Sequence, residues 1–202
     1  YSLPLMISVF SFWIIDSSSV IIQKYFINLT QIGLYTIGSQ FGFFILLVVS
    51  GISSAWPPYY FKNYVNSNSD KISNYLIFFF QIACLSGFLI SILSPIFFKI
   101  LISERYYDGL KIIPFITSAY ILRIPYLFFL VSVISVNKTK QVALTEISTA
   151  LICIVLNIIF LPIFGFIAGA ISIFISNLIL CVLFYFLSLK YKPISNLELK
   201  NF

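Results

Sequence analysis

Six long apolar stretches, separated by short polar breaks, fill most of this 202-residue chain. A helix that crosses a bilayer needs ~20 mostly apolar residues, because the hydrocarbon core is ~30 Å thick and the helix rises about 1.5 Å per residue. The stretches are unbroken, unlike the ~10-residue segments of alternating polarity in a transmembrane β-barrel. The sequence therefore predicts an all-α integral membrane bundle of six transmembrane helices, forming a single domain over residues 1–202. The predicted spans are 3–23, 33–56, 75–102, 111–136, 142–161 and 165–189.

Charge supports a membrane location and predicts an orientation. Charged residues make up 9% of the chain, against roughly a quarter in soluble domains. The net charge of +6 would suggest nucleic acid in a soluble protein, but here the lysines flank the spans, and we expect no nucleic-acid partner. If the spans alternate, seven lysines fall on one side and four basic residues on the other. The positive-inside rule then predicts that both termini of this segment are cytoplasmic.

Several classes of chemistry are disfavoured. The chain has no histidine, which removes Ser-His-Asp and Cys-His catalysis and histidine-ligated metals. Cys84, Cys153 and Cys181 lack the paired spacing of a metal site or a disulfide framework, so we expect them to be small core residues. No predicted loop is long enough to house an enzyme's active site. The sequence predicts no enzyme, no cofactor and no metal.

Prolines and glycines predict where helices end. Pro57-Pro58 is expected to stop the second span, because proline lacks an N–H and constrains the residue before it. The polar segment 61–74 that follows would be a cytoplasmic connection. Residues 162–165, Pro-Ile-Phe-Gly, form a turn signal that predicts a tight antiparallel hairpin of the last two spans.

Asp16 lies near the middle of the first span, within an arc of polar side chains. A carboxylate at mid-depth costs ~2.5–3.5 kcal/mol on insertion scales, so it needs a partner or a water-filled cavity. Asp16 is therefore a candidate for coupling to a proton or cation, or else a structural, ion-paired residue. The rest of the arc is expected to pack against neighbouring helices. Its other members are Ser8, Ser11, Ser18, Ser19 and Gln23.

Arg123 lies at the centre of the fourth span, with Tyr120 and Tyr126 one turn to either side. Pro125 frees the carbonyl of Ile121 and predicts an interruption of the helix beside the charge. A guanidinium binds phosphate oxygens in a bidentate fork, so these three side chains are candidates for a substrate cavity that holds a phosphate-bearing ligand. The alternative is that Arg123 pairs with Asp16 and fixes two helices together.

Glu146, about one turn inside the fifth span, is expected to form an interfacial ion pair with Lys138 or Lys140. The charged residues between positions 104 and 111 are expected to form a solvated turn.

Short motifs spread through most of the chain resemble the C-terminal half of a polysaccharide-unit flippase. This is the O-antigen (Wzx-type) group of the multidrug/oligosaccharidyl-lipid/polysaccharide exporter superfamily. One departure is Ser19-Val20, where many relatives carry an Asp-Arg pair. The motifs are Leu3-Pro4, Ile15-Asp16-Ser17-Ser18, Ile32-Gly33-Leu34-Tyr35, Trp56-Pro57, Lys138-Thr139-Lys140, Leu156-Asn157-Ile158, Leu161-Pro162-Ile163-Phe164-Gly165-Phe166 and Gly169-Ala170.

The resemblance implies one six-helix lobe of a two-lobe transporter in the bacterial cytoplasmic (inner) membrane. Such transporters move undecaprenyl-pyrophosphate-linked oligosaccharides across that membrane by alternating access, for O-antigen, lipopolysaccharide or capsular polysaccharide biosynthesis. The partners would be the lipid-linked oligosaccharide, membrane lipid and an N-terminal lobe, which we expect to be missing here because the chain begins at Tyr1. Two alternatives stay open: a drug or cation exporter of the same superfamily, and part of a membrane glycan polymerase or ligase.

Overall fold

The computed structural model describes residues 2–65 and 69–191, with side chains described for 6–62 and 74–191. Within these ranges the chain is helical apart from short connections and contains no strand, which confirms the predicted all-α class. The elements are α1 (Ser2–Phe26), α2 (Leu29–Phe43), α3 (Ile45–Val65), α4 (Ser69–Leu101), the 3-10 helix η1 (Glu104–Ile112), α5 (Ile113–Ile121), α6 (Arg123–Ile134), α7 (Thr139–Phe164) and α8 (Ile167–Tyr191).

By length and composition, five helical stretches within the described ranges can cross a membrane, and a bent pair of helices can make a sixth. The bent pair is α2 with α3, which meet at 42° around Phe44. The fourth span, predicted as one helix, consists of η1, α5 and α6. The predicted interruption beside Arg123 is confirmed, because α5 ends at Ile121 and α6 begins at Arg123. The chain is therefore a multi-pass helical membrane bundle.

The prediction that Pro57-Pro58 ends the second span was wrong. Helix α3 continues through both prolines to Val65. Trp56 and Tyr60, on either side of them, are buried in one apolar cluster with Phe128 of α6. The Trp56 and Phe128 rings stack with centroids 3.6 Å apart. This packing holds the turns before and after the prolines in place, which offsets the lost backbone hydrogen bonds. The loop expected at 61–74 is correspondingly shorter.

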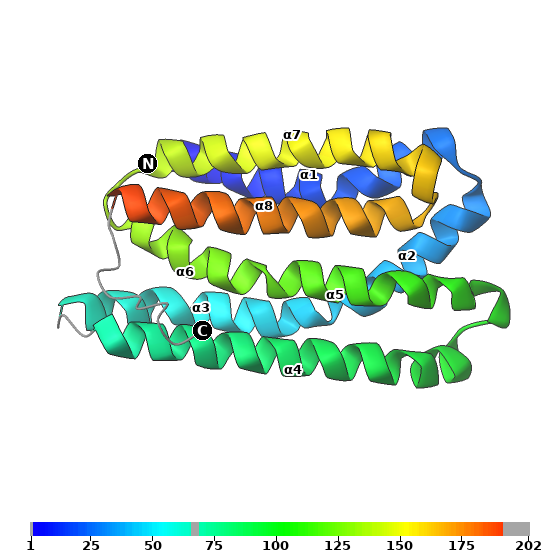
Figure 1. Cartoon of the computed structure of the whole chain (residues 1–202), viewed down its shortest axis with the longest axis horizontal. Coiled ribbons are helices and arrows are strands. Elements are labelled where there is room, and N and C mark those ends of the chain that lie inside the picture. Colours follow the sequence, from blue (N-terminus) through cyan, green and yellow to red (C-terminus); the bar gives the residue numbers. More distant parts are fainter. Residues whose placement is uncertain (1, 66–68, 192–202) are drawn as a thin grey trace.

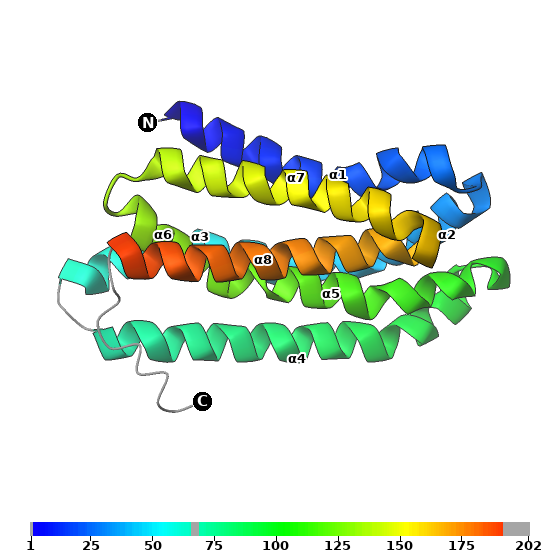
Figure 2. The same ribbon diagram turned by 45° about the horizontal axis from the view of Figure 1, so that its top comes forward.

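The helices run nearly side by side along the long axis of the bundle (Figure 1). Helices α1 and α7 lie on one side and α4 on the other, with α8, α5 and α6 between them in both views, whereas α3 lies beside α4 in Figure 1 and behind α6 and α8 in the turned view (Figure 2). The central position of the α5–α6 span agrees with its burial. In the most apolar stretch of this span 61% of the residues are buried, against 11% in the corresponding stretch of α4. Arg123, in this span, therefore lies inside the bundle.

The predicted hairpin of the last two spans is confirmed. Helix α7 ends at Phe164 and α8 begins at Ile167, with Gly165 between them at φ +57°, a conformation that favours glycine. The charged residues between positions 104 and 111 lie in the 3-10 helix η1 rather than in the expected turn, but they are solvated: Lys111 and Asp108 form an ion pair of 2.8 Å between side chains that are both 62% exposed.

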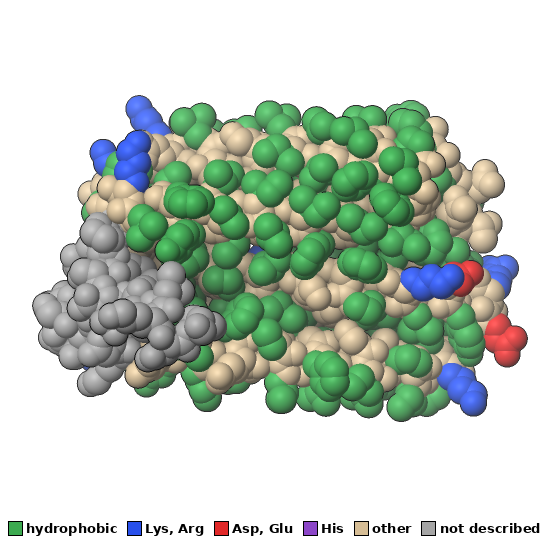
Figure 3. Space-filling view, in the orientation of Figure 1, with side chains coloured by type: hydrophobic (Ala, Val, Ile, Leu, Met, Phe, Trp, Pro, Cys, Tyr) green, Lys and Arg blue, Asp and Glu red, His purple; other side chains and the backbone are tan. Residues whose placement is uncertain are grey.

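The outer surface suits a lipid environment. Hydrophobic side chains cover the length of the bundle in Figure 3, and the charged side chains visible there gather at its two ends. Of the cysteines, Cys153 is buried and Cys181 is partly buried, whereas Cys84 is exposed, so the expectation that all three are core residues was wrong for Cys84. Cys84 lies on α4, the span with the smallest buried share.

Close approach between α2 and η1 depends on Gly38. A Cβ at this position would meet the carbonyl oxygen of Gly109 and the Ile112 side chain well inside van der Waals contact, whereas a Cβ on Gly51 of α3 would meet nothing within 4 Å. We expect Gly38→Ala to destabilise the protein by about 1–3 kcal/mol, the usual range for overpacking. The matched control, Gly51→Ala, should be neutral or slightly stabilising, because alanine favours helix. Thermal unfolding in detergent checks both variants, and equal behaviour of the two would contradict the packing.

Candidate functional site

Asp16 and Arg123 meet at mid-depth in the bundle. The Arg123 Nη2 lies 2.5 Å from the Asp16 Oδ1, which joins the middle of α1 to the first residue of α6. The guanidinium side chain is 11% exposed and the carboxylate side chain 27%. The alternative in which Arg123 pairs with Asp16 is therefore what the structure shows. In a low-dielectric setting the pair carries far less electrostatic cost than either charge alone.

Side chains of three spans complete the environment of the pair. Arg123 Nε donates to the Asn177 Oδ1 of α8 at 3.1 Å, and the guanidinium carbon lies 4.8 Å and 4.5 Å from the ring centroids of Phe12 and Tyr120. The Tyr120 hydroxyl donates to Asp16 Oδ1 at 3.0 Å. These contacts fix the guanidinium between two aromatic faces and two oxygen acceptors.

The two tyrosines that flank Arg123 in sequence contact different acids. Tyr126 donates its hydroxyl to the Glu146 Oε1 of α7 at 2.5 Å rather than joining Tyr120 at the ion pair. The expectation that Glu146 forms an interfacial ion pair was wrong, because its side chain is buried and has no ion pair within the part of the chain that the structure describes. Lys138 instead lies over the Tyr191 ring, with its Nζ 5.6 Å from the centroid.

A cavity of about 500 Å³, open to the surface of the bundle, begins at Arg123 and lies between α1, α3, α6 and α7. Polar groups line it at Arg123, Tyr126, Glu146 and three serines, whereas aliphatic and aromatic side chains line the remainder. The lining residues beyond Arg123 approach the start of α7 and the N-terminal end of α1, so the cavity extends from mid-depth toward that end of the bundle. The apolar and serine positions are Ser8, Val9, Phe12, Leu46, Val49, Ser50, Ser53, Leu127, Leu130, Ile134 and Val142.

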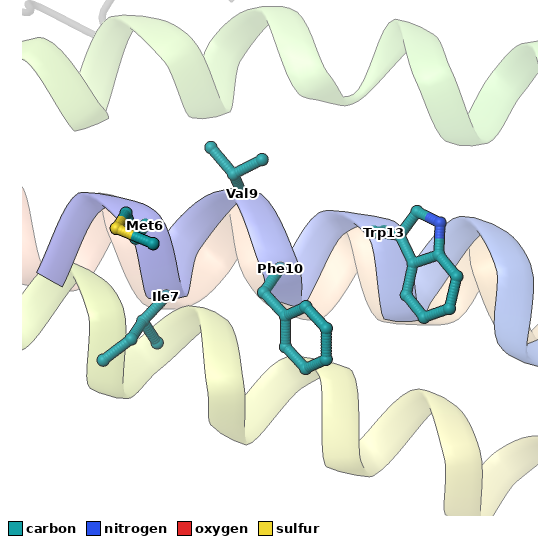
Figure 4. Close-up of a pocket in the computed structure, with 5 residues that line it drawn as sticks. All are labelled: Met6, Ile7, Val9, Phe10 and Trp13. Carbon is teal, nitrogen blue, oxygen red and sulfur yellow. The ribbon is translucent and has the colours of Figure 1, made fainter. Parts of the chain in front are cut away.

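A second hollow, on the outside of α1, has no comparable chemistry. It is lined by five residues of this one helix: Met6, Ile7, Val9, Phe10 and Trp13. Figure 4 shows Val9 on one edge of the helix, Ile7 and Phe10 on the other, and Trp13 farther along it. The hollow is an apolar stripe on the surface of the bundle, and the indole N–H of Trp13 is the one side-chain polar group among the residues that line it.

The polar arc of α1 faces protein, as predicted. Ser11, Ser18, Ser19 and Gln23 are all buried, and the Gln23 amide donates to the Phe166 carbonyl at the start of the last span. Polar residues of α7 and α8 are buried as well, and sequence reasoning had not assigned them a site role. They are Thr139, Thr149, Asn157, Ser172, Ser176, Asn177 and Ser188.

Spacing along α7 could have identified Glu146 as an inward-facing residue. Glu146, Thr149, Cys153 and Asn157 follow one another at intervals of three or four, so they share one face of the helix, and all are buried. The proximity of Glu146 to the lysines at the start of the span had instead predicted an interfacial ion pair.

Comparisons of the chain with protein-family models, with curated proteins and with solved structures give no match. The function therefore rests on the site and on the residue patterns of the chain.

Proposed function

We propose that this chain is a six-helix lobe of a transporter that moves polyprenyl-pyrophosphate-linked oligosaccharides across the bacterial cytoplasmic membrane by alternating access. The supporting observation is the cavity, which begins at an arginine at mid-depth and combines that cation with hydroxyl groups and apolar walls. Such a cavity matches a ligand with a phosphate head and a lipid tail. The motifs that resemble the polysaccharide-unit flippases agree with the same substrate class.

The ion pair fits this proposal because Arg123 does not depend on Asp16 alone. Asn177, Phe12 and Tyr120 also contact the guanidinium, so it can exchange one carboxylate oxygen for a phosphate oxygen without losing its position. A phosphate binding there would compete with Asp16 for Nη2. The transport step itself requires no covalent chemistry, only a change in which side of the membrane the cavity faces.

Complementation of a flippase-deficient bacterium tests the proposal. The complete gene is expected to restore surface polysaccharide, and Arg123→Ala is expected to abolish that restoration at matched membrane expression. Lys111→Ala is the matched control, because Lys111 is a basic residue in an exposed ion pair at the surface of the bundle. If the wild-type gene restores no glycan, or if Arg123→Ala restores it fully, the proposal fails.

A cation or drug exporter is the second candidate, favoured by the greater exposure of Asp16 than of Arg123. In that case the carboxylate would bind the cationic substrate, and Asp16→Asn would cost more transport than Arg123→Ala. Export of a cationic dye by cells that regain no surface glycan would favour this function over the flippase.

A further inference from the structure

Glu146 is a buried acid with an unusual set of partners. Its side chain is 1% exposed, and the Tyr126 hydroxyl donates to its Oε1 at 2.5 Å. No lysine or arginine among residues 6–62 and 74–191 forms an ion pair with it. An ionised carboxylate that is buried without a cation is costly, and this cost falls when the carboxyl takes up a proton.

Asp16 has the opposite environment, although both acids lie in spans. Its Oδ1 accepts from Arg123 Nη2 and from the Tyr120 hydroxyl, so the ionised form is matched by a cation. Protonation of Asp16 would leave the guanidinium without its counter-charge. Of the two acids, Glu146 is the one that can gain or lose a proton without disrupting an ion pair.

Water can reach the Glu146 carboxyl through the cavity that it lines, because protein side chains cover its other sides. Helix α6 contributes Tyr126 and, one turn earlier, Arg123, and α1 contributes Ser8; all three line the cavity together with Glu146. Across the cavity, α3 contributes Ser50 and Ser53. Helix α8 packs against Tyr126 and Val142, the neighbours of Glu146 in the cavity, with the apolar Leu180 and Phe184, and the Tyr185 ring packs against Phe129. On α7 itself the nearest cation in sequence is the exposed Lys140.

Charge in the shared cavity links the protonation of Glu146 to ligand binding. An ionised Glu146 adds a negative charge to the cavity that Arg123 also lines, and that charge repels an anionic head group. A neutral Glu146 adds no such repulsion, and the cavity then carries only the Asp16–Arg123 pair, whose guanidinium a phosphate head group can contact. Since coupling between two sites is reciprocal, ligand binding would favour protonation of Glu146 to the same degree.

We propose that Glu146 is the proton-binding group of this cavity and that its protonation sets how tightly the cavity holds an anionic phosphate head group. In the step itself, a hydronium ion in the cavity transfers its proton to a carboxylate oxygen of Glu146 and leaves water, and the reverse step releases the proton. Tyr126 orients the carboxyl and keeps its own proton. The link to ligand binding rests on the proposed transport function, whereas the proton site itself does not.

Infrared difference spectroscopy of the full-length gene product in nanodiscs tests the proton site directly. Alkaline titration is expected to remove a protonated-carboxyl C=O band, and Glu146→Gln is expected to lack that band. Glutamine preserves the fold, because its amide oxygen still accepts from Tyr126. Asp16→Asn is expected to keep the band, and Tyr126→Phe is expected to shift its frequency. A titrating band that persists in Glu146→Gln would overturn the assignment.

Binding of undecaprenyl pyrophosphate tests the link to the ligand. Wild-type protein is expected to bind this probe about tenfold more tightly at acidic than at alkaline pH, within the range of ~5–150-fold typical of coupled sites. Glu146→Gln should bind at the acidic value at every pH. A wild-type pH dependence that survives in Glu146→Gln would overturn the link. Absence of binding at any pH would contradict the proposed function, while the infrared result would still decide the proton site.

Discussion

Arg123→Gln should be the most destabilising single substitution in the cavity, and adding Asp16→Asn should recover much of the loss. Removal of one member of a buried ion pair costs about 3–5 kcal/mol, because the other charge stays buried without a partner. The 27% exposure of the Asp16 side chain lets water offset part of this penalty, so we expect a value below that range. Removing both charges leaves two amides that can hydrogen-bond to each other.

Thermal unfolding of four proteins in detergent measures this coupling: wild type, each single variant and the double variant. We expect a favourable coupling of about 1–3 kcal/mol, as for residues in direct contact. Lys111→Gln is the matched control, since it breaks the exposed pair with Asp108 and should leave stability nearly unchanged. Additive losses in the double variant would show that Asp16 and Arg123 do not stabilise each other.

Filling the cavity should stop transport without unfolding the protein. Ser53 of α3 lines the cavity, whereas Ser54 is exposed and does not line it. We expect Ser53→Phe to abolish complementation, because the new ring occupies space that the substrate needs, while Ser54→Phe should complement like wild type. Both hydroxyls donate to the Ser50 carbonyl, so the two variants lose equivalent hydrogen bonds.

The control for this pair is the amount of folded protein in the membrane, measured by size-exclusion profiles after detergent extraction. Equal activity of the two variants at equal folded amounts would argue that the substrate does not pass through the cavity.

Sequence reasoning located the spans because length and hydropathy are properties of each helix alone. It failed at Pro57-Pro58 because the continuation of α3 depends on contacts with another span, chiefly Trp56 against Phe128. The bend at Phe44 is a similar case. No proline marks this bend, and α2 packs closely against η1 at Gly38. Features that arise between helices do not follow from the pattern of one helix.

The same limit applied to the site. Asp16 and Arg123 were each identifiable, because a charge within an apolar run needs a reason to be there. An ion pair between them was only one of two alternatives, because a single sequence does not show which helices are neighbours. Tyr120 and Tyr126 lie on one face of one span, yet Tyr120 contacts Asp16 of α1 and Tyr126 contacts Glu146 of α7.

Direct measurement of lipid translocation tests the central claim, that substrate crosses the membrane through a cavity whose binding group is Arg123. Proteoliposomes containing the complete gene product and a polyprenyl-pyrophosphate-linked oligosaccharide would be sampled for substrate accessible in the outer leaflet. We predict that wild-type protein equilibrates the substrate between leaflets, and that the folded Asp16→Asn, Arg123→Gln double variant does not. A wild-type rate equal to that of protein-free liposomes, or an unchanged rate in the double variant, would contradict the claim.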